Sequence, residues 1–123
     1  MKNIIKLSDI KKDINFNELE MSGFSIGTSF YRGKNYEDLL SYIVHFMNVN
    51  FSIIPIRYVE IINNQSPIKV VVDRKKLSTT ENYVLLNRYF ISLDHEPNEI
   101  VSCTIAICNA FKINKSEIKL IFE

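Results

Sequence analysis

Apolar residues recur at helical spacing in two stretches of the chain, and both stretches are predicted to be helices. In the first, residues 36–48, Asn35 is a suitable N-cap and Asp38 places an acid in the first turn. The second, within residues 94–113, has acids near its beginning and lysine near its end, as the helix dipole favours. The repeating apolar positions are Tyr36, Leu39, Leu40, Ile43 and Met47 in the first stretch, and Ile100, Cys103, Ile107, Cys108 and Phe111 in the second.

Extended segments are predicted between and around these helices. Residues 51–62 are rich in β-branched and aromatic side chains, so we predict a strand there, with Pro55 at an edge or a bulge. A turn at 63–66 then leads to a partner strand at 67–73, completing a hairpin. Other strands are predicted at 2–7, 24–30, 83–93 and 117–123, and an irregular connection at 8–23.

Residues 83–93 fit two structures. A helix capped by Thr80 is one of them, but the tyrosine, valine, phenylalanine and isoleucine content favours a strand. The resulting order is strand, strand, helix, three-stranded meander, helix, strand. We therefore predict an α+β fold over residues 1–123, a single domain with a mostly antiparallel sheet, a central three-stranded meander and two main helices.

The only two cysteines, Cys103 and Cys108, lie on the second predicted helix. Five residues turn an α-helix so far that these side chains point about 140° apart, which excludes a disulfide between them. Neither has a second cysteine or a histidine at metal-ligand spacing. We expect both to be small apolar side chains of a buried helix.

Composition excludes several classes of function. Fifteen basic and fourteen acidic side chains give a formal net charge of +1, without the basic surplus that phosphate binding requires. No window reaches the roughly 18 apolar residues of a membrane span, and residues 1–16 lack the pattern of a signal peptide. The sequence indicates a cytoplasmic protein that binds neither nucleic acid directly nor membranes, and we expect no metal or cofactor.

Two groups of residues resemble catalytic sets. Asp38, Ser41 and His45 share one face of the first helix, but Asp38 and His45 are about 10 Å apart along the axis, too far for a triad. His95 lies between Asp94 and Glu96, which we interpret as a helix cap. We predict no catalytic residue, and a small enzyme using His95 with nearby acids is kept as an alternative.

The composition of residues 29–36 is typical of a recognition surface. Tyr31 and Arg32 are residue types that dominate binding hot spots, because they bury large rigid area and keep polar groups. Charged residues of both signs elsewhere would help to steer a partner. The predicted partner-binding residues are Tyr31, Arg32, Arg74, Lys75, Asp94 and Glu96.

In size, low glycine content, meander flanked by helices and lack of a cofactor motif, the chain resembles the immunity proteins of contact-dependent growth inhibition and other polymorphic toxin systems. The resemblance implies a non-catalytic inhibitor that binds a cognate toxin domain, often a nuclease, and blocks its active site. The near-neutral charge departs from acidic inhibitors that neutralise basic nucleases. A secretion chaperone acting as a homodimer is the alternative, and an exposed apolar patch or dimer face would favour it.

Overall fold

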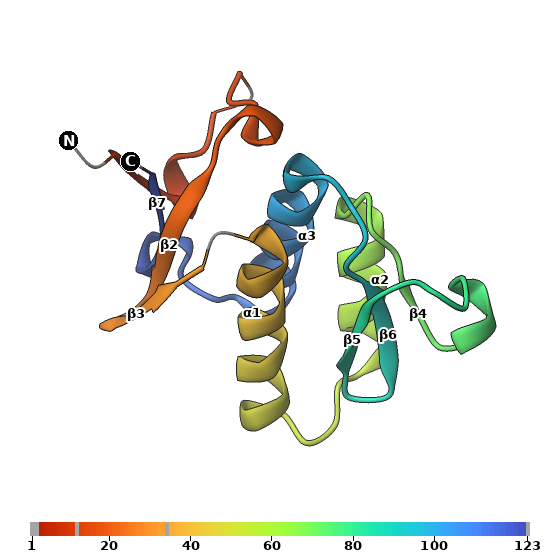
Figure 1. Ribbon diagram of the computed structural model, residues 1–123. Coiled ribbons are helices and arrows are strands. Elements are labelled where there is room, and N and C mark those ends of the chain that lie inside the picture. Colours follow the sequence, from red (N-terminus) through yellow and green to blue (C-terminus); the bar gives the residue numbers. More distant parts are fainter. Residues whose placement is uncertain (1–2, 12, 34, 123) are drawn as a thin grey trace.

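Two antiparallel sheets lie on either side of a helical layer in the computed structural model, which describes residues 3–11, 13–33 and 35–122 (Figure 1). The helices are α1 (Tyr36–Asn50), α2 (Ile56–Gln65) and α3 (Pro97–Phe111). The strands are β1 (Asn3–Lys6), β2 (Met21–Ile26), β3 (Ser29–Arg32), β4 (Val70–Val71), β5 (Tyr83–Leu86), β6 (Tyr89–Ser92) and β7 (Ile118–Phe122). Short 3-10 turns are η1 (Leu7–Asp9), η2 (Phe16–Glu18), η3 (Arg74–Lys76) and η4 (Lys115–Glu117).

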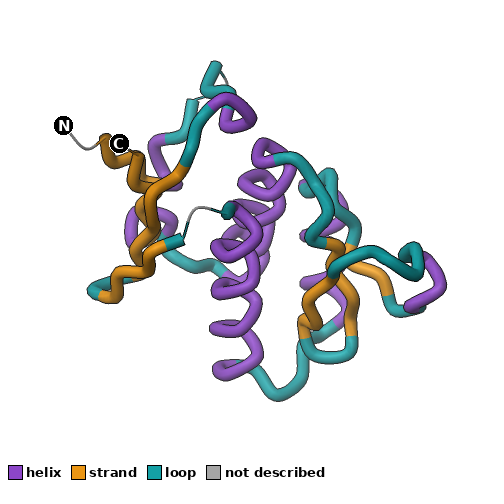
Figure 2. Tube along the Cα trace, in the orientation of Figure 1, coloured by secondary structure: helices purple, strands orange, loops and turns teal. Residues whose placement is uncertain are grey.

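The strand orders are β1-β7-β2-β3 in the four-stranded sheet and β4-β6-β5 in the three-stranded sheet, and every pairing is antiparallel. The tube view shows α1 and α3 between the two sheets (Figure 2). The predicted α+β class is therefore confirmed, as are the helices at 36–48 and within 94–113. The structure differs from the prediction in two respects: there are two sheets instead of one, and a third helix, α2, stands in place of the first strand of the predicted meander. The three-stranded sheet is built from the middle of the chain, but its order β4-β6-β5 is not that of a meander, in which consecutive strands are neighbours.

The predicted strand at 51–62 is wrong, because most of this stretch belongs to α2. Pro55 stands at the N-cap with an extended backbone, where its missing N–H removes no hydrogen bond from the helix that follows. Val59 and Ile62 then fall three residues apart and are both buried. Packing against α3 overrides the β-propensity of these side chains, which is a weak preference by comparison.

The remaining strand predictions differ in detail. Residues 83–93 form the hairpin β5–β6 rather than one strand, and Asn87 begins its turn with φ 56°, a conformation that asparagine tolerates. In the same way 24–30 is divided between β2 and β3 by a turn at Gly27, whose φ is 60°. Of 67–73 only Val70–Val71 is a strand. The strands predicted at 2–7 and 117–123 are confirmed as β1 and β7, with residues 2 and 123 outside the described part.

Helix α3 forms the centre of the core. It packs against both α1 and α2, and its apolar side chains occupy nearly its whole circumference. The one hydroxyl buried among them is satisfied, since the Thr104 Oγ1 donates to the carbonyl of Ile100 at 2.9 Å. Its buried residues are Ile100, Val101, Cys103, Thr104, Ala106, Ile107, Cys108 and Ala110. The hydrophobic cluster around them draws on all three helices and both sheets.

Two asparagine amides pair with the outer strands of the three-stranded sheet. On α2, the Asn63 Oδ1 accepts from the Val70 N–H at 2.7 Å and its Nδ2 donates to the Val70 carbonyl at 3.0 Å. On α1, the Asn48 Nδ2 donates to the Leu85 carbonyl at 2.8 Å, and its Oδ1 accepts from the Asn87 N–H at 2.7 Å. Each amide thus substitutes for a neighbouring strand, and together they satisfy backbone groups at both edges of this sheet, Asn63 at β4 and Asn48 at β5.

Replacing Asn63 with Ala should lower the free energy of unfolding by about 1–3 kcal/mol, because both Val70 backbone groups lose their partner. The same change at the exposed neighbour Asn64 should stay within about 0.5 kcal/mol. Urea denaturation of the two variants measures the difference. Equal stability of Asn63→Ala and Asn64→Ala would show that the amide pairing contributes little.

Candidate functional site

The predicted partner-binding residues lie in three separate places. Tyr31 and Arg32 are on β3, Arg74 and Lys75 are on η3, and Asp94 and Glu96 precede α3. In Figure 1, β3 lies on one side of the helices and the segment after β4 that contains η3 lies on the other. The structure therefore does not bring the six residues into one site, and each place is considered by itself.

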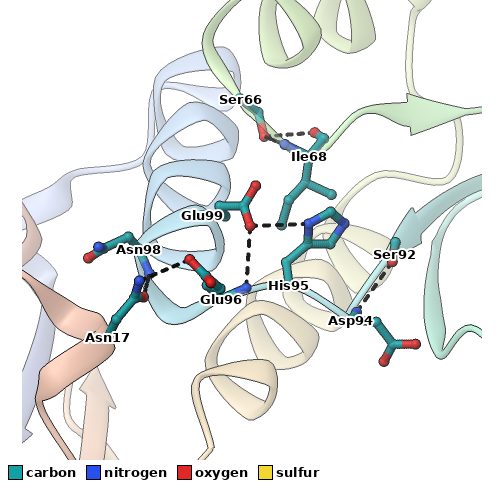
Figure 3. Close-up of polar contacts among 9 residues, drawn as sticks. All are labelled: Asn17, Ser66, Ile68, Ser92, Asp94, His95, Glu96, Asn98 and Glu99. Atoms are coloured by element: carbon teal, nitrogen blue, oxygen red, sulfur yellow. Dashed lines mark hydrogen bonds and ion pairs between the residues drawn. The ribbon is translucent and has the colours of Figure 1, made fainter.

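Asp94 and Glu96 make hydrogen bonds within the protein. The Asp94 carboxylate accepts from the backbone N–H of Asn82 at 3.0 Å and from its Nδ2 at 3.2 Å. Figure 3 shows the Asp94 N–H directed to the Ser92 hydroxyl, and the Glu96 carboxylate accepting from the Asn17 amide at 3.0 Å. The predicted cap lies in this segment, but its position differs: Glu96, which was expected at the cap's inner side with Asp94 as the cap, is itself the N-cap residue of α3. Both side chains connect loops to the start of this helix.

His95 is half-buried and pairs with the helix that follows it. Its Nδ1 lies 3.6 Å from the Glu99 Oε1, a separation of four residues that Figure 3 shows across the first turn of α3. A hollow beside it is also lined by Glu20, Glu37 and Tyr36. The Tyr36 hydroxyl donates to the Leu19 carbonyl at 2.9 Å, and burial raises its pKa to about 12, so it stays protonated.

The described residues include no group of three or more histidine, cysteine, aspartate or glutamate side chains that could hold a metal ion. The candidate triad on α1 is also not assembled. Asp38 and His45 are both exposed on the outer face of that helix, two turns apart.

Cys103 and Cys108 are free and buried, as the sequence predicted. Neither side chain has measurable exposure to solvent. Burial raises the pKa of the Cys103 thiol to about 11 and that of Cys108 to about 12. Since the thiolate is the reactive form, these buried and protonated thiols are poor nucleophiles near neutral pH.

One exposed apolar feature lies on α1 and β3. Tyr42, Phe46 and Val49 recur at i, i+4 and i+7, and they are 42%, 46% and 70% exposed. Tyr31 lies against Tyr42, with ring centroids 4.3 Å apart. We call this set, together with Arg32, the α1–β3 surface. Its helical residues lie on a different face of α1 from the residues that are buried in the core.

Aromatic contacts connect the α1–β3 surface to the core. Phe24, which is fully buried in β2, lies 5.2 Å from Tyr31 and 5.5 Å from Tyr42 between ring centroids. Further along α1, Phe46 lines a hollow together with Ile26 of β2 and Ile113. Phe24, Tyr31 and Tyr42 therefore form one cluster of rings in mutual contact, buried at Phe24 and partly exposed at the two tyrosines.

A second exposed feature is the outward face of the three-stranded sheet. Tyr83 and Leu85 are 41% and 42% exposed, and Phe90 contacts Tyr83 edge-to-face with centroids 5.1 Å apart. The Arg74 guanidinium lies 4.8 Å from the centroid of the Tyr83 ring. We call Arg74, Lys75, Tyr83, Leu85 and Phe90 the β5–β6 surface.

Arg74 is held in place on this surface. Its NH1 donates to the carbonyls of Leu77 at 3.3 Å and Ser78 at 3.1 Å while the guanidinium stacks on Tyr83. Lys75 lies in the same short turn, where the Asp73 side chain accepts from its backbone N–H. The result is a half-exposed aromatic centre beside fixed positive charge, which can dock on a protein surface with little loss of side-chain entropy.

Sequence reasoning missed Tyr42, Phe46, Tyr83 and Leu85. The outer face of α1 was interpreted as polar because of Asp38 and His45, although Tyr42 and Phe46 stand four residues apart on it. Tyr83 and Leu85 are exposed and alternate with the half-buried Val84 and the buried Leu86, which is the signal of a strand with two different faces. Both patterns are present in the sequence. Only the arrangement of helices and strands shows that this face of α1 and this face of the three-stranded sheet are exposed to solvent.

Comparison with known proteins gives no family. No protein-family model matches the chain, and no match was found among the curated proteins or the solved structures. Among the described residues, no helix has the length and apolar character that crossing a membrane requires.

Thiol-specific reagents at pH 8 should modify neither cysteine in the native protein, since both thiols are buried and protonated. In denaturant both should react at the rate of a free cysteine, whose pKa is about 8.5. A colorimetric thiol titration with and without guanidinium measures this. Rapid reaction of either thiol in the native state would contradict the burial of α3.

Proposed function

We propose that this chain is a non-catalytic, cytoplasmic inhibitor of the immunity-protein type, which binds a cognate bacterial toxin domain and occludes its active site. The observation that carries the proposal is the β5–β6 surface, where a fixed arginine is stacked on an exposed tyrosine. Tyrosine and arginine supply most hot-spot residues of protein interfaces, and rigid examples lose little entropy on binding.

The composition of this surface favours a partner with acidic groups. Positive charge borders it, because Arg74, Lys75 and Lys76 follow one another in η3 and the Lys75 and Lys76 side chains are exposed. The apolar centre formed by Tyr83 and Leu85 would then be shielded from water by these charges. Such a surface is unlike a phosphate mimic, so inhibition by covering the active site is the mechanism that fits it.

The alternative of a homodimeric secretion chaperone is favoured by a different feature, the α1–β3 surface. Its exposed apolar residues form the kind of patch that dimer faces and unfolded clients use. A small enzyme using His95 with the neighbouring acids is the remaining alternative, and the hollow beside His95 with Glu20 and Glu37 is where it would act.

Affinity purification with the tagged protein from its native host, read by mass spectrometry, should yield one stoichiometric partner. Arg74→Glu should raise the Kd for that partner by about 30-fold or more, the size of a hot-spot loss. Its matched control is Arg57→Glu, because Arg57 also lies over a tyrosine ring, at 5.1 Å, but on α2. Calorimetric titration of the purified pair measures both values.

The same variants distinguish the proposed function from its alternatives. A toxin partner whose action on cells is neutralised by wild type and by Arg57→Glu, but poorly by Arg74→Glu, supports the immunity function. Recovery of many unfolded clients would support the chaperone. Equal affinity of both variants for a single partner would show that the β5–β6 surface is not the interface.

A further inference from the structure

The four-stranded sheet has an open edge at β3. This strand is the last in the order β1-β7-β2-β3, so among the described residues no strand lies on its outer side. The three-stranded sheet is different, because Asn63 and Asn48 satisfy backbone groups at both of its edges. An open strand edge is a template for pairing with another strand.

The direction of the backbone groups of β3 follows from its pairing with β2. A Cβ placed on Gly23 would lie 2.7 Å from the Tyr31 carbonyl oxygen, so that oxygen is directed toward β2. Successive residues of an antiparallel strand direct their N–H and C=O groups to alternate sides. Phe30 and Arg32 therefore direct their backbone N–H and C=O groups toward the open side of β3.

The α1–β3 surface borders this same edge. Tyr31 points to the helical side of the sheet, where Tyr42 lies against it at 4.3 Å. Exposure increases across these three rings, from the fully buried Phe24 to the half-buried Tyr31 and to Tyr42, which is 42% exposed. Tyr31 and Tyr42 therefore remain partly exposed beside the open edge, and one more strand next to β3 would shield them from solvent.

We propose that β3 pairs with β3 of a second copy of this chain, antiparallel and about a two-fold axis at Tyr31. In this register Phe30 of each copy stands opposite Arg32 of the other, and all four residues direct backbone groups into the interface. The two sheets then form one continuous sheet. The α1 stripes of the two copies lie beside the axis on its helical side.

The side chains are self-complementary in this register, as a two-fold interface requires. Phe30 and Arg32 share the outer face of the sheet, so each arginine lies across from a phenylalanine ring and the two arginines do not face each other. On the inner face, Tyr31 meets Tyr31 of the second copy. An axis at Phe30 instead would place Arg32 opposite Thr28, in the turn between β2 and β3.

The apolar area at this edge fits a small, reversible interface. Phe30 is 52% exposed and Tyr42 is 42% exposed. Aromatic side chains bury about 150–250 Å² each when fully covered, so these two can contribute roughly 200 Å² per copy. The β3 backbone and Arg32 add to this, toward the low end of interface sizes, below about 1,200 Å² in total, where weak and transient contacts are found.

The proposed dimer goes beyond the proposed function and leaves the β5–β6 surface free for another protein. Arg74→Glu tests the function and changes nothing at β3. The two proposals can therefore fail independently.

Sedimentation velocity over a wide concentration range tests the dimer with the full chain. Wild type should form a reversible dimer with a Kd in the micromolar range. Tyr42→Glu should raise that Kd by at least about tenfold, because each interface receives two carboxylates near the axis. The matched control, Val72→Glu, alters a side chain that is 61% exposed beyond the end of β4, and it should leave the Kd unchanged.

A cysteine pair tests the register directly. Opposite residues of a non-hydrogen-bonded pair have Cα atoms about 4.5 Å apart, within disulfide range, so Tyr31→Cys should cross-link two copies under mild oxidation. Ser29→Cys on the same strand should not, because the two Ser29 positions would be about 13 Å apart. The native thiols are buried and do not compete.

A monomer at every concentration would overturn the proposal, as would a dimer that Tyr42→Glu and Val72→Glu weaken equally or not at all. Cross-linking of Ser29→Cys as fast as Tyr31→Cys would overturn the register. Circular dichroism confirms that each variant is folded. If Tyr42→Glu fails to fold, the two cysteine variants still decide the question.

Discussion

The fold depends on burying a helix that is apolar around most of its surface. One sheet or one neighbouring helix cannot bury all of α3, because Val101, Ile107 and Cys108 must be covered from different directions. Helices α1 and α2 provide this cover, and each also contributes buried side chains to the core beneath a sheet. The two sheets are thereby held apart, and each has a face or an edge left in contact with solvent.

Polar contacts in this protein rest largely on side-chain amides. Asn63 and Asn48 complete the edges of the three-stranded sheet, while the Asn98 Oδ1 accepts from the Phe16 N–H at 2.7 Å and fixes the segment before β2 to α3. Where an edge is capped in this way, the flat face of the sheet is left as its contact surface. In the part of the chain that the structure describes, no such amide pairs with β3, so that edge is available to a partner.

The sequence was sufficient to predict α1, α3, the antiparallel character of the sheets and the burial of both cysteines, because periodicity reports which faces are covered. It failed at 51–62, where isoleucine and valine suit a strand in isolation but pack against α3 as a helix. Tyr31 and Arg32 were identified by residue type alone. Tyr42 could not be separated from core residues, since its exposure depends on where the sheet ends.

The central claim is that both sheets depend on the packing of α3. Native-state hydrogen exchange of wild type and Ile107→Ala tests it most directly, because Ile107 is fully buried in that helix. The slowest amides of α3, β6 and β7 should all lose the same free energy of exchange, about 2–5 kcal/mol. Loss confined to one sheet, with the other unchanged, would show that the two sheets are stabilised separately.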